Sequence, residues 1–198
     1  MPTVIQPLRE GSPIALGEAF ETVLAAAQAG AEWAWRELYR EAAPAVERYL
    51  RARRVPDVED VVGETFVNVV RSIDGFEGNE TAFRGWVFAI ARNRATDERR
   101  RLIRHPSAPA SIEELDGGGP RGDVENEAME GLATDRIGRL LDTLTADQRD
   151  VLLLRIIGGL TIDQVAAAVG RNAGAVKMLQ ARGLAAIRRE IERGAVTL

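Results

Sequence analysis

A short run near the C-terminus carries the side chains best suited to chemistry with a nucleic acid. These are Arg171, Asn172, Lys177, Gln180 and Arg182. Arginine, asparagine and glutamine can pair with base edges, and lysine and arginine also neutralise phosphates. So small a set neutralises only a few phosphates, and non-specific binding alone typically has a dissociation constant of about 10⁻⁴ to 10⁻⁶ M. The sequence therefore predicts a DNA-binding surface that has low affinity by itself.

Residues that could support covalent or metal chemistry are scarce. The chain has no cysteine, which excludes disulfides, thiolate zinc sites and cysteine nucleophiles. His105 is the one histidine and precedes Pro106, so an imidazole cluster for catalysis or metal binding cannot be assembled. No carboxylate cluster indicates a metal site either. We therefore expect a protein that is not an enzyme and that needs no cofactor or metal.

The basic run must be positioned by the residues before it, which have the pattern of a helix-turn-helix. Capping boxes in "TADQ" and "TIDQ" predict helix starts at Thr145 and Thr161. Ala166 is small where two helices cross, Gly170 permits a turn with positive φ, and Val176 holds the second helix on the first. The other buried positions are expected to be Val165, Val169 and Leu179. An ordinary helical hairpin with a glycine cap is the alternative.

Apolar periodicity predicts helix nearly throughout the chain, with no alternating run that indicates a sheet. We expect an all-α protein of two small helical domains joined by a flexible acidic linker. The predicted divisions are a loosely ordered N-terminus over 1–16, a first domain over 17–104, a Gly/Pro-containing linker over 105–131 and a helix-turn-helix domain over 132–198. Pro44 is expected either to kink a helix over 31–53 or to open a new one.

The formal net charge of -4 hides an uneven distribution. Residues 105–133 hold seven acidic residues and one arginine, which leaves 25 basic against 23 acidic residues in the rest of the chain. Just before them stands a cluster of arginines, namely Arg92, Arg94, Arg99, Arg100, Arg101 and Arg104. This cluster is a candidate phosphate-contacting surface, and a solvated helix end favoured by the helix dipole is the alternative.

A second candidate nucleic-acid reader combines this basic stretch with the loop "DGFEGNET" before it. Amide, carboxylate and aromatic groups beside a basic helix suit unstacked bases and a single-stranded backbone. The alternative is that Phe83 and Trp86, which lie on the apolar stripe, belong to the core.

The chain shows no sign of a membrane or export segment. It has no run of about 18 uncharged apolar residues, and its N-terminus lacks a basic segment followed by an apolar one. We expect a cytoplasmic protein without stable membrane insertion.

Two blocks of the chain resemble the extracytoplasmic-function (ECF) sigma factors of bacteria, in the sigma-70 superfamily. "DVEDVVGETFVNVVRSIDGFEGNETAFRGWVFAIARNRATDERRR" resembles their region 2, and "LLDTLTADQRDVLLLRIIGGLTIDQVAAAVGRNAGAVKMLQARGLAAIRRE" resembles their region 4. The blocks occur in the family's order and cover about Ala31 to Ile191, nearly the whole chain. The run "LQ.R.L" is similar to that of some actinobacterial members, and Ala175, Met178 and Leu179 depart from the commoner pattern.

The resemblance implies a promoter-specificity subunit that binds core RNA polymerase and promoter DNA, with an anti-sigma protein as a further partner. Region 2 would read the -10 element and hold the melted strand through Gly75, Phe76, Asn79, Thr81, Arg92, Asn93, Asp97, Arg100 and Arg101. Region 4 would read the -35 element through Arg171, Asn172, Ala175, Lys177, Met178, Gln180 and Arg182. Polymerase would be bound through Asp60, Glu64, Phe66, Leu152 and Ile156.

Two other functions fit the residues alone. In one, the chain is an autonomous helix-turn-helix regulator that binds operator DNA, with Ala31 to Ile103 as a dimerisation or ligand module. In the other, it is an all-helical adaptor whose basic stretches are solvated faces. Tight binding to a palindrome without polymerase would distinguish the regulator from a sigma factor.

Overall fold

The computed structural model describes residues 16–104 and 140–194. Their elements are η1 (Gly17–Ala19), α1 (Phe20–Gln28), α2 (Glu32–Ala52), α3 (Val58–Ser72), η2 (Ile73–Gly75), α4 (Glu80–Arg104), α6 (Ala146–Ile156), α7 (Ile162–Val169) and α8 (Ala173–Glu192). No strand occurs in these two stretches, so the prediction of an all-α protein is confirmed. The predicted linker over 105–131 and residues 1–15 lie outside the described residues.

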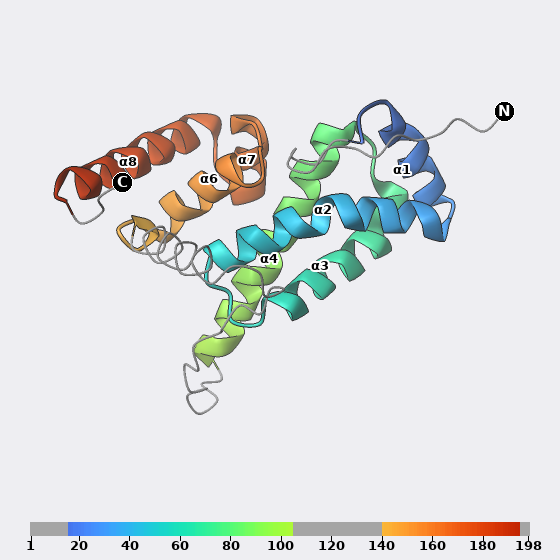
Figure 1. The fold of residues 1–198 in the computed structure, drawn as a ribbon, viewed down its shortest axis with the longest axis horizontal. Helices are drawn as coiled ribbons and strands as arrows, with labels where there is room; N and C mark the ends of the chain where they lie inside the picture. The colour runs from blue at the N-terminus through green and yellow to red at the C-terminus, as the bar shows by residue number, and fades with distance from the viewer. Residues whose placement is uncertain (1–15, 105–139, 195–198) are drawn as a thin grey trace, which may run out of the picture.

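The helices α1 to α4 form a bundle in which the long helix α4 crosses α2 and α3 (Figure 1). Its core is rich in aromatic rings, and the rings of Tyr49 and Phe88 meet edge to face with their centroids 5.6 Å apart. The predicted apolar stripe of α3 faces this core: Val62, Thr65, Phe66, Val69 and Ile73 are buried, and Val58 is half-buried. Phe83 is also buried, as its place on the apolar stripe predicts.

Pro44 does not open a new helix, because α2 runs unbroken from Glu32 to Ala52, which leaves the alternative of one helix that contains the proline. A proline inside a helix loses one backbone hydrogen bond and crowds the preceding turn. Pro44 itself is exposed, while Ala43 and Ala45 on either side of it are buried. We infer that burial of the residues around the proline outweighs its local cost.

The helix-turn-helix is formed by α7 and α8, with α6 packed against α8. Both predicted capping boxes are present, at Thr145 with Gln148 and at Thr161 with Gln164. Gly170 ends α7 in the left-handed region with φ of 65°, as the turn requires. The predicted packing residue Val176 is fully buried.

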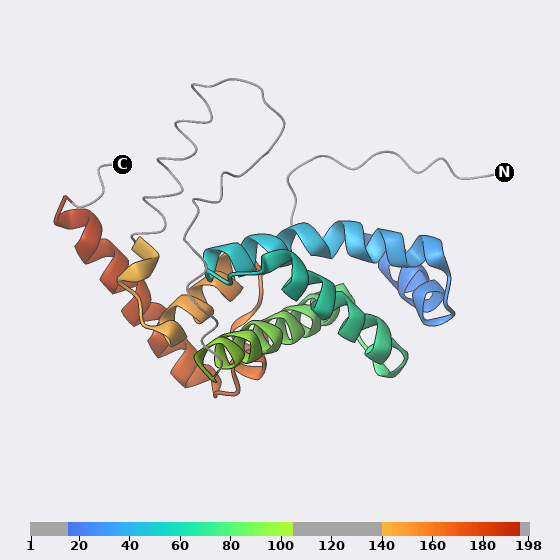
Figure 2. The same cartoon turned by 90° about the horizontal axis from the view of Figure 1, so that it is seen from below.

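The two helical parts pack directly on each other. Figure 2 shows α1 and α8 at opposite ends of the molecule, while α6 and α7 contact the bundle. One continuous apolar core includes residues of both parts. The α4 and α7 helices approach closely where Gly85 faces the side chain of Gln164. The Gln164 amide nitrogen donates to the backbone oxygen of Thr81 while its amide oxygen completes the capping box of α7.

Of the helices in the described stretches, none has the combined length and apolar character of a membrane span.

Candidate DNA and polymerase surfaces

The loop before α4, which contains the expected -10 residues, is fixed by hydrogen bonds from both sides. The amide nitrogen of Gln28 donates to the backbone oxygens of Ile73 and Phe76, at 2.9 and 3.0 Å. Asn79 caps α4, because its Oδ1 accepts from the backbone N–H of Ala82 at 2.9 Å. Glu80 accepts from the backbone N–H of Leu16 at 2.8 Å. The loop is therefore held in one shape without any nucleic acid, and sequence reasoning missed the contribution of Gln28.

The exposed positions of this loop are those with small or polar side chains. Gly75, Asn79 and Thr81 are exposed. Phe76 is half-buried and stacks on Trp86 with the ring centroids 5.0 Å apart. A base received here would meet the loop's backbone and the Asn79 side chain, since one face of the Phe76 ring is already covered.

The basic C-terminal half of α4 is partly neutralised by carboxylates of the same helix. Asp97 lies 3.5 Å from Nη1 of Arg100, and Glu98 lies 2.7 Å from Nη2 of Arg101. The hydrogen bond from Arg101 lowers the pKa of Glu98 below its usual range. Asn93, Asp97, Arg100 and Arg101 are all exposed on this helix. They form one polar surface, and a phosphate would have to compete with Asp97 and Glu98 for the arginines.

Arg92 does not join that exposed surface, because it is held between the two helical parts. Its Nε lies 3.1 Å from Oδ2 of Asp150, and its Nη1 donates to the backbone oxygen of Ala168 at 3.3 Å. Arg53 contacts the other oxygen of Asp150 at 2.8 Å. The Asp150 carboxylate thus joins α6 to α4 and to the residue that follows α2.

Arg53, Arg92 and Asp150 form an ion triad, and the burial of Asp150 decides how much this triad contributes to stability. Burial raises the pKa of Asp150, and the charges of Arg53 and Arg92 oppose that effect. Burial also raises the pKa of the neighbouring Tyr49 hydroxyl. Because a buried ion pair loses hydration as it gains attraction, the triad chiefly aligns the two surfaces, and apolar contacts hold them together. Sequence reasoning missed Asp150 and Arg53; the one available signal was a carboxylate directly before the apolar run "VLLL".

The N-terminal end of α8 divides the expected -35 residues into two groups. Asn172 caps the helix, accepting from the backbone N–H of Ala175 at 2.8 Å, and Arg171 pairs with Asp147 at 2.6 Å. Lys177, Met178 and Arg182 are exposed, whereas Ala175 and Gln180 are half-buried. Within the described part of the chain, neither Lys177 nor Arg182 makes a hydrogen bond or ion pair. These two cations and the Met178 thioether are therefore available to a ligand.

The expected polymerase residues also separate into exposed and buried ones. Asp60 and Glu64 are exposed on α3, and Ile156 is 71% exposed at the end of α6. Phe66 is buried, with its ring 4.6 Å from that of Tyr39, and Leu152 is buried against α8. In this arrangement the side chains of Phe66 and Leu152 are buried inside the protein, and their role in binding polymerase stays a prediction. Each lies on the apolar stripe of its own helix, and that stripe packs inward.

The chain was compared with known proteins. The family models for Sigma-70 region 2 and Sigma-70, region 4 match residues 38–105 and 134–187. The ECF RNA polymerase sigma factor SigD of Mycobacterium tuberculosis is 33% identical over 182 residues, which cover 88% of this chain and 85% of SigD. The chain belongs to the ECF RNA polymerase sigma factors. Another ECF sigma factor, ShbA of Streptomyces griseus, is 31% identical over 73% of this chain and 81% of its own.

Solved structures agree with this sigma-factor fold. CnrH, solved in complex with the cytosolic domain of CnrY, matches with a TM-score of 0.66 at 24% identity, over 89% of this chain and 99% of CnrH. The sigma factor RpoE of Bartonella quintana, solved with the anti-sigma factor NepR, matches with a TM-score of 0.61 at 20% identity, over 79% and 96% of the two chains. The function of an ECF sigma factor, promoter-directed transcription initiation with RNA polymerase, follows from family membership, and the autonomous regulator is not favoured.

Proposed function

We propose that this sigma factor reads promoter DNA with two separate surfaces: the exposed face of α8 at the -35 element, and the loop before α4 with the adjoining helix at the -10 element. The helix-turn-helix supports the proposal most strongly. The left-handed turn at Gly170 leads into α8, where Lys177 and Met178 are exposed in the N-terminal half and Arg182 is exposed at the middle of the helix. The N-terminal end of the second helix is the part that enters the major groove in such motifs. Met178 would give an apolar contact, such as one to a thymine methyl group.

At the -10 element, the proposed pocket lies at the exposed loop positions Gly75, Asn79 and Thr81. The melted strand would continue along the polar surface of α4, which includes Asn93 and Arg100. Unstacking a base costs a few kcal/mol, and contacts to the base and backbone offset that cost. The chain would thus melt DNA through binding energy, without catalysing a reaction.

The packed arrangement of the two helical parts suits the polymerase-free protein. Arg92 cannot hold Asp150 and a DNA phosphate with the same guanidinium edge. We infer that α6, α7 and α8 move away from the bundle when polymerase is bound, which frees Arg92 for the single strand. Asp60, Glu64 and Ile156 are exposed and could contact polymerase before this movement.

The proposal places the protein in the cytoplasm, where the polymerase works. It also includes an anti-sigma partner, because the Bartonella sigma factor was solved with the anti-sigma factor NepR, and CnrH was solved with the cytosolic domain of CnrY. A partner that stabilises the packed arrangement would keep Arg92 unavailable to DNA.

Reconstitution with core RNA polymerase tests this function. The purified chain alone should bind duplex promoter fragments poorly, because α8 offers few free cations. Added to core polymerase, it should produce transcripts with defined start sites, mapped by sequencing RNA ends from genomic DNA templates. Tight footprinting of a palindrome by the chain without polymerase would contradict the proposal.

A further inference from the structure

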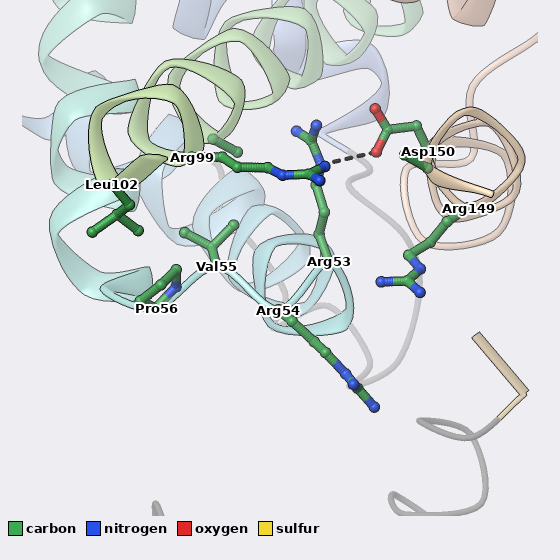
Figure 3. A pocket seen from close by; sticks show the side chains of 10 residues that line it. Arg53, Arg54, Val55, Pro56, Arg99, Leu102, Arg149 and Asp150 are labelled. Atoms are coloured by element: carbon green, nitrogen blue, oxygen red, sulfur yellow. Dashed lines mark ion pairs between the residues drawn. The ribbon is translucent and has the colours of Figure 1, made fainter. Parts of the chain in front are cut away.

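A cavity of about 420 Å³ opens between the two helical parts, next to the Asp150 triad (Figure 3). Its walls come from the turn after α2, from the basic half of α4 and from the first turn of α6. Pockets for small molecules in proteins usually measure about 300 to 1,000 Å³. The cavity is therefore large enough for a small ligand, and the proposed sigma-factor function does not use it.

The cavity carries an excess of positive charge. Four arginines line it, namely Arg53, Arg54, Arg99 and Arg149, against the single carboxylate of Asp150. Asp150 is shared between Arg53 and Arg92. Asp142 is likewise shared between Arg54 at 2.9 Å and Arg149 at 3.4 Å. With Arg92 and Asp142, which lie beside the lining, five guanidinium groups and two carboxylates gather here among the described residues, an excess of three positive charges.

Arg99 is the lining residue with most to offer a ligand. It is exposed, and it has no hydrogen bond or ion pair within residues 16–104 and 140–194. Figure 3 shows its side chain extending from α4 toward the guanidinium of Arg53. Two like charges that share a cavity repel each other, and an anion between them would relieve that repulsion. Ala146, the first residue of α6, adds the positive end of a helix dipole.

The remaining wall is apolar. Val55, Pro56 and Leu102 line the side of the cavity where Arg99 enters. Such a surface suits a flat ring, while the guanidinium groups suit phosphate oxygens, which they bind with paired hydrogen bonds. One phosphate group carries at most about two negative charges, so a chain of phosphates matches the excess better than a single one.

We propose that this cavity binds a nucleoside polyphosphate, with its phosphates among Arg53, Arg99 and Arg149 and its ring on Val55, Pro56 and Leu102. Because the walls belong to both helical parts, the ligand binds only while they are packed together. At a concentration one hundred times its dissociation constant, a ligand of this kind favours the packed arrangement by about 100-fold. The nucleotide would thereby limit how much of the protein is open to polymerase and promoter.

Isothermal titration calorimetry with the full chain tests the site at fixed ionic strength. ATP should bind saturably with one molecule per chain. Adenosine should bind far more weakly, and tripolyphosphate should bind several-fold more weakly than ATP. No saturable ATP binding would overturn the proposal. Tripolyphosphate binding as tightly as ATP would overturn the assignment of a nucleotide.

Two arginine variants separate a built site from general attraction of anions. Arg99→Ala should weaken ATP binding about tenfold, the effect of losing one charged phosphate contact. Arg71→Ala is the matched control: Arg71 is an exposed arginine in the last turn of α3 and lies outside the cavity. Equal weakening by both variants would show non-specific attraction and would overturn the proposal. In the part of the chain that the structure describes, neither arginine makes a hydrogen bond or ion pair, so both variants should fold normally, which circular dichroism checks.

Energy transfer between two fluorophores tests whether ATP binding favours the packed arrangement. The chain has no cysteine, so Glu21→Cys in α1 and Arg188→Cys in α8 allow two fluorophores to be attached at opposite ends of the molecule. ATP should increase energy transfer between them in the otherwise unchanged protein and should have little effect in the Arg99→Ala background. Equal changes in both backgrounds would contradict a coupling through this cavity. No polymerase is present in either assay, so the result is independent of the proposed promoter contacts.

Discussion

Nε of Arg92 in α4 lies 3.1 Å from Oδ2 of Asp150 in α6, so a side chain expected on DNA is instead engaged by the other half of the protein. The two residues are 58 positions apart in the chain. Their contact requires the packed arrangement, whereas promoter contact requires Arg92 to be free. The binding partner of the Arg92 guanidinium therefore differs between the two arrangements: it is Asp150 in the packed one and DNA in the open one.

Reversing the charge at Asp150 should open the packed arrangement. Asp150→Lys places a third cation beside Arg53 and Arg92, and like charges at this distance disfavour the charged forms strongly. We expect the equilibrium constant for packing to fall at least about tenfold, which corresponds to about 1.4 kcal/mol. Energy transfer between the labels in α1 and α8 measures it. Asp147→Lys is the control, since Asp147 is on the same helix and makes a more exposed pair; a similar loss of transfer in both variants would rule out a specific role for the triad.

Replacement of Asn79 should separate its structural role from its contact with DNA. Asn79→Ala removes both the helix cap and the amide, and Asn79→Ser keeps a capping oxygen. The alanine variant should lose about 1 kcal/mol of unfolding free energy, measured by thermal denaturation, while the serine variant should stay near wild type. Both should impair open-complex formation, measured by permanganate reactivity of the melted strand. Normal melting of DNA by Asn79→Ser would mean that Asn79 only holds the loop.

Neutralising Lys177 should weaken promoter binding without affecting the fold, because its side chain is exposed and unpaired within the described residues. Lys177→Ala should lower the affinity of the holoenzyme for duplex promoter DNA and reduce the slope of log affinity against log salt by about one. A salt titration of binding measures both. Arg189→Ala removes an exposed arginine in the last turn of α8 and should leave the slope unchanged. A slope that changes only in Arg189→Ala would place the DNA at the C-terminal end of α8 and would contradict the proposed contact at Lys177.

Two glycines inside helices should respond to alanine in opposite directions. A Cβ at Gly183 would lie 2.9 Å from Cδ1 of the buried Leu152, so Gly183→Ala should cost about 1 to 3 kcal/mol through overpacking. A Cβ at Gly63 would meet nothing within 4 Å, so Gly63→Ala should stabilise α3 by about 0.5 to 1 kcal/mol. Chemical denaturation measures both free energies. Destabilisation by both would show that the space around Gly63 is needed for another reason.

Local features of the fold could be predicted from the sequence because the residues that decide them are close together in the chain. The capping boxes at Thr145 and Thr161 and the left-handed Gly170 depend on neighbours within a few positions. The apolar stripe of α3 could also be predicted, since helical periodicity sets which side chains face the core. The sequence could not decide between the two alternatives at Pro44, because the choice depends on packing around the proline.

The candidate sites were harder to predict for the same reason. The exposed positions Lys177 and Arg182 follow from the pattern of the recognition helix. The sharing of Asp150 between Arg53 and Arg92, and the cavity beside it, depend on how the two helical parts dock. Charge counts along the sequence indicate basic stretches, but they do not show which cations will face each other.

Gln164 makes one further property of the molecule clear. Its amide nitrogen holds the bundle at Thr81, while its amide oxygen caps α7 through Thr161. Separation of the two parts breaks the first bond and leaves the second, so helices α6 to α8 are released already folded. Capture of a promoter by α8 then needs no refolding step before or after the separation, and its speed should be set by diffusion.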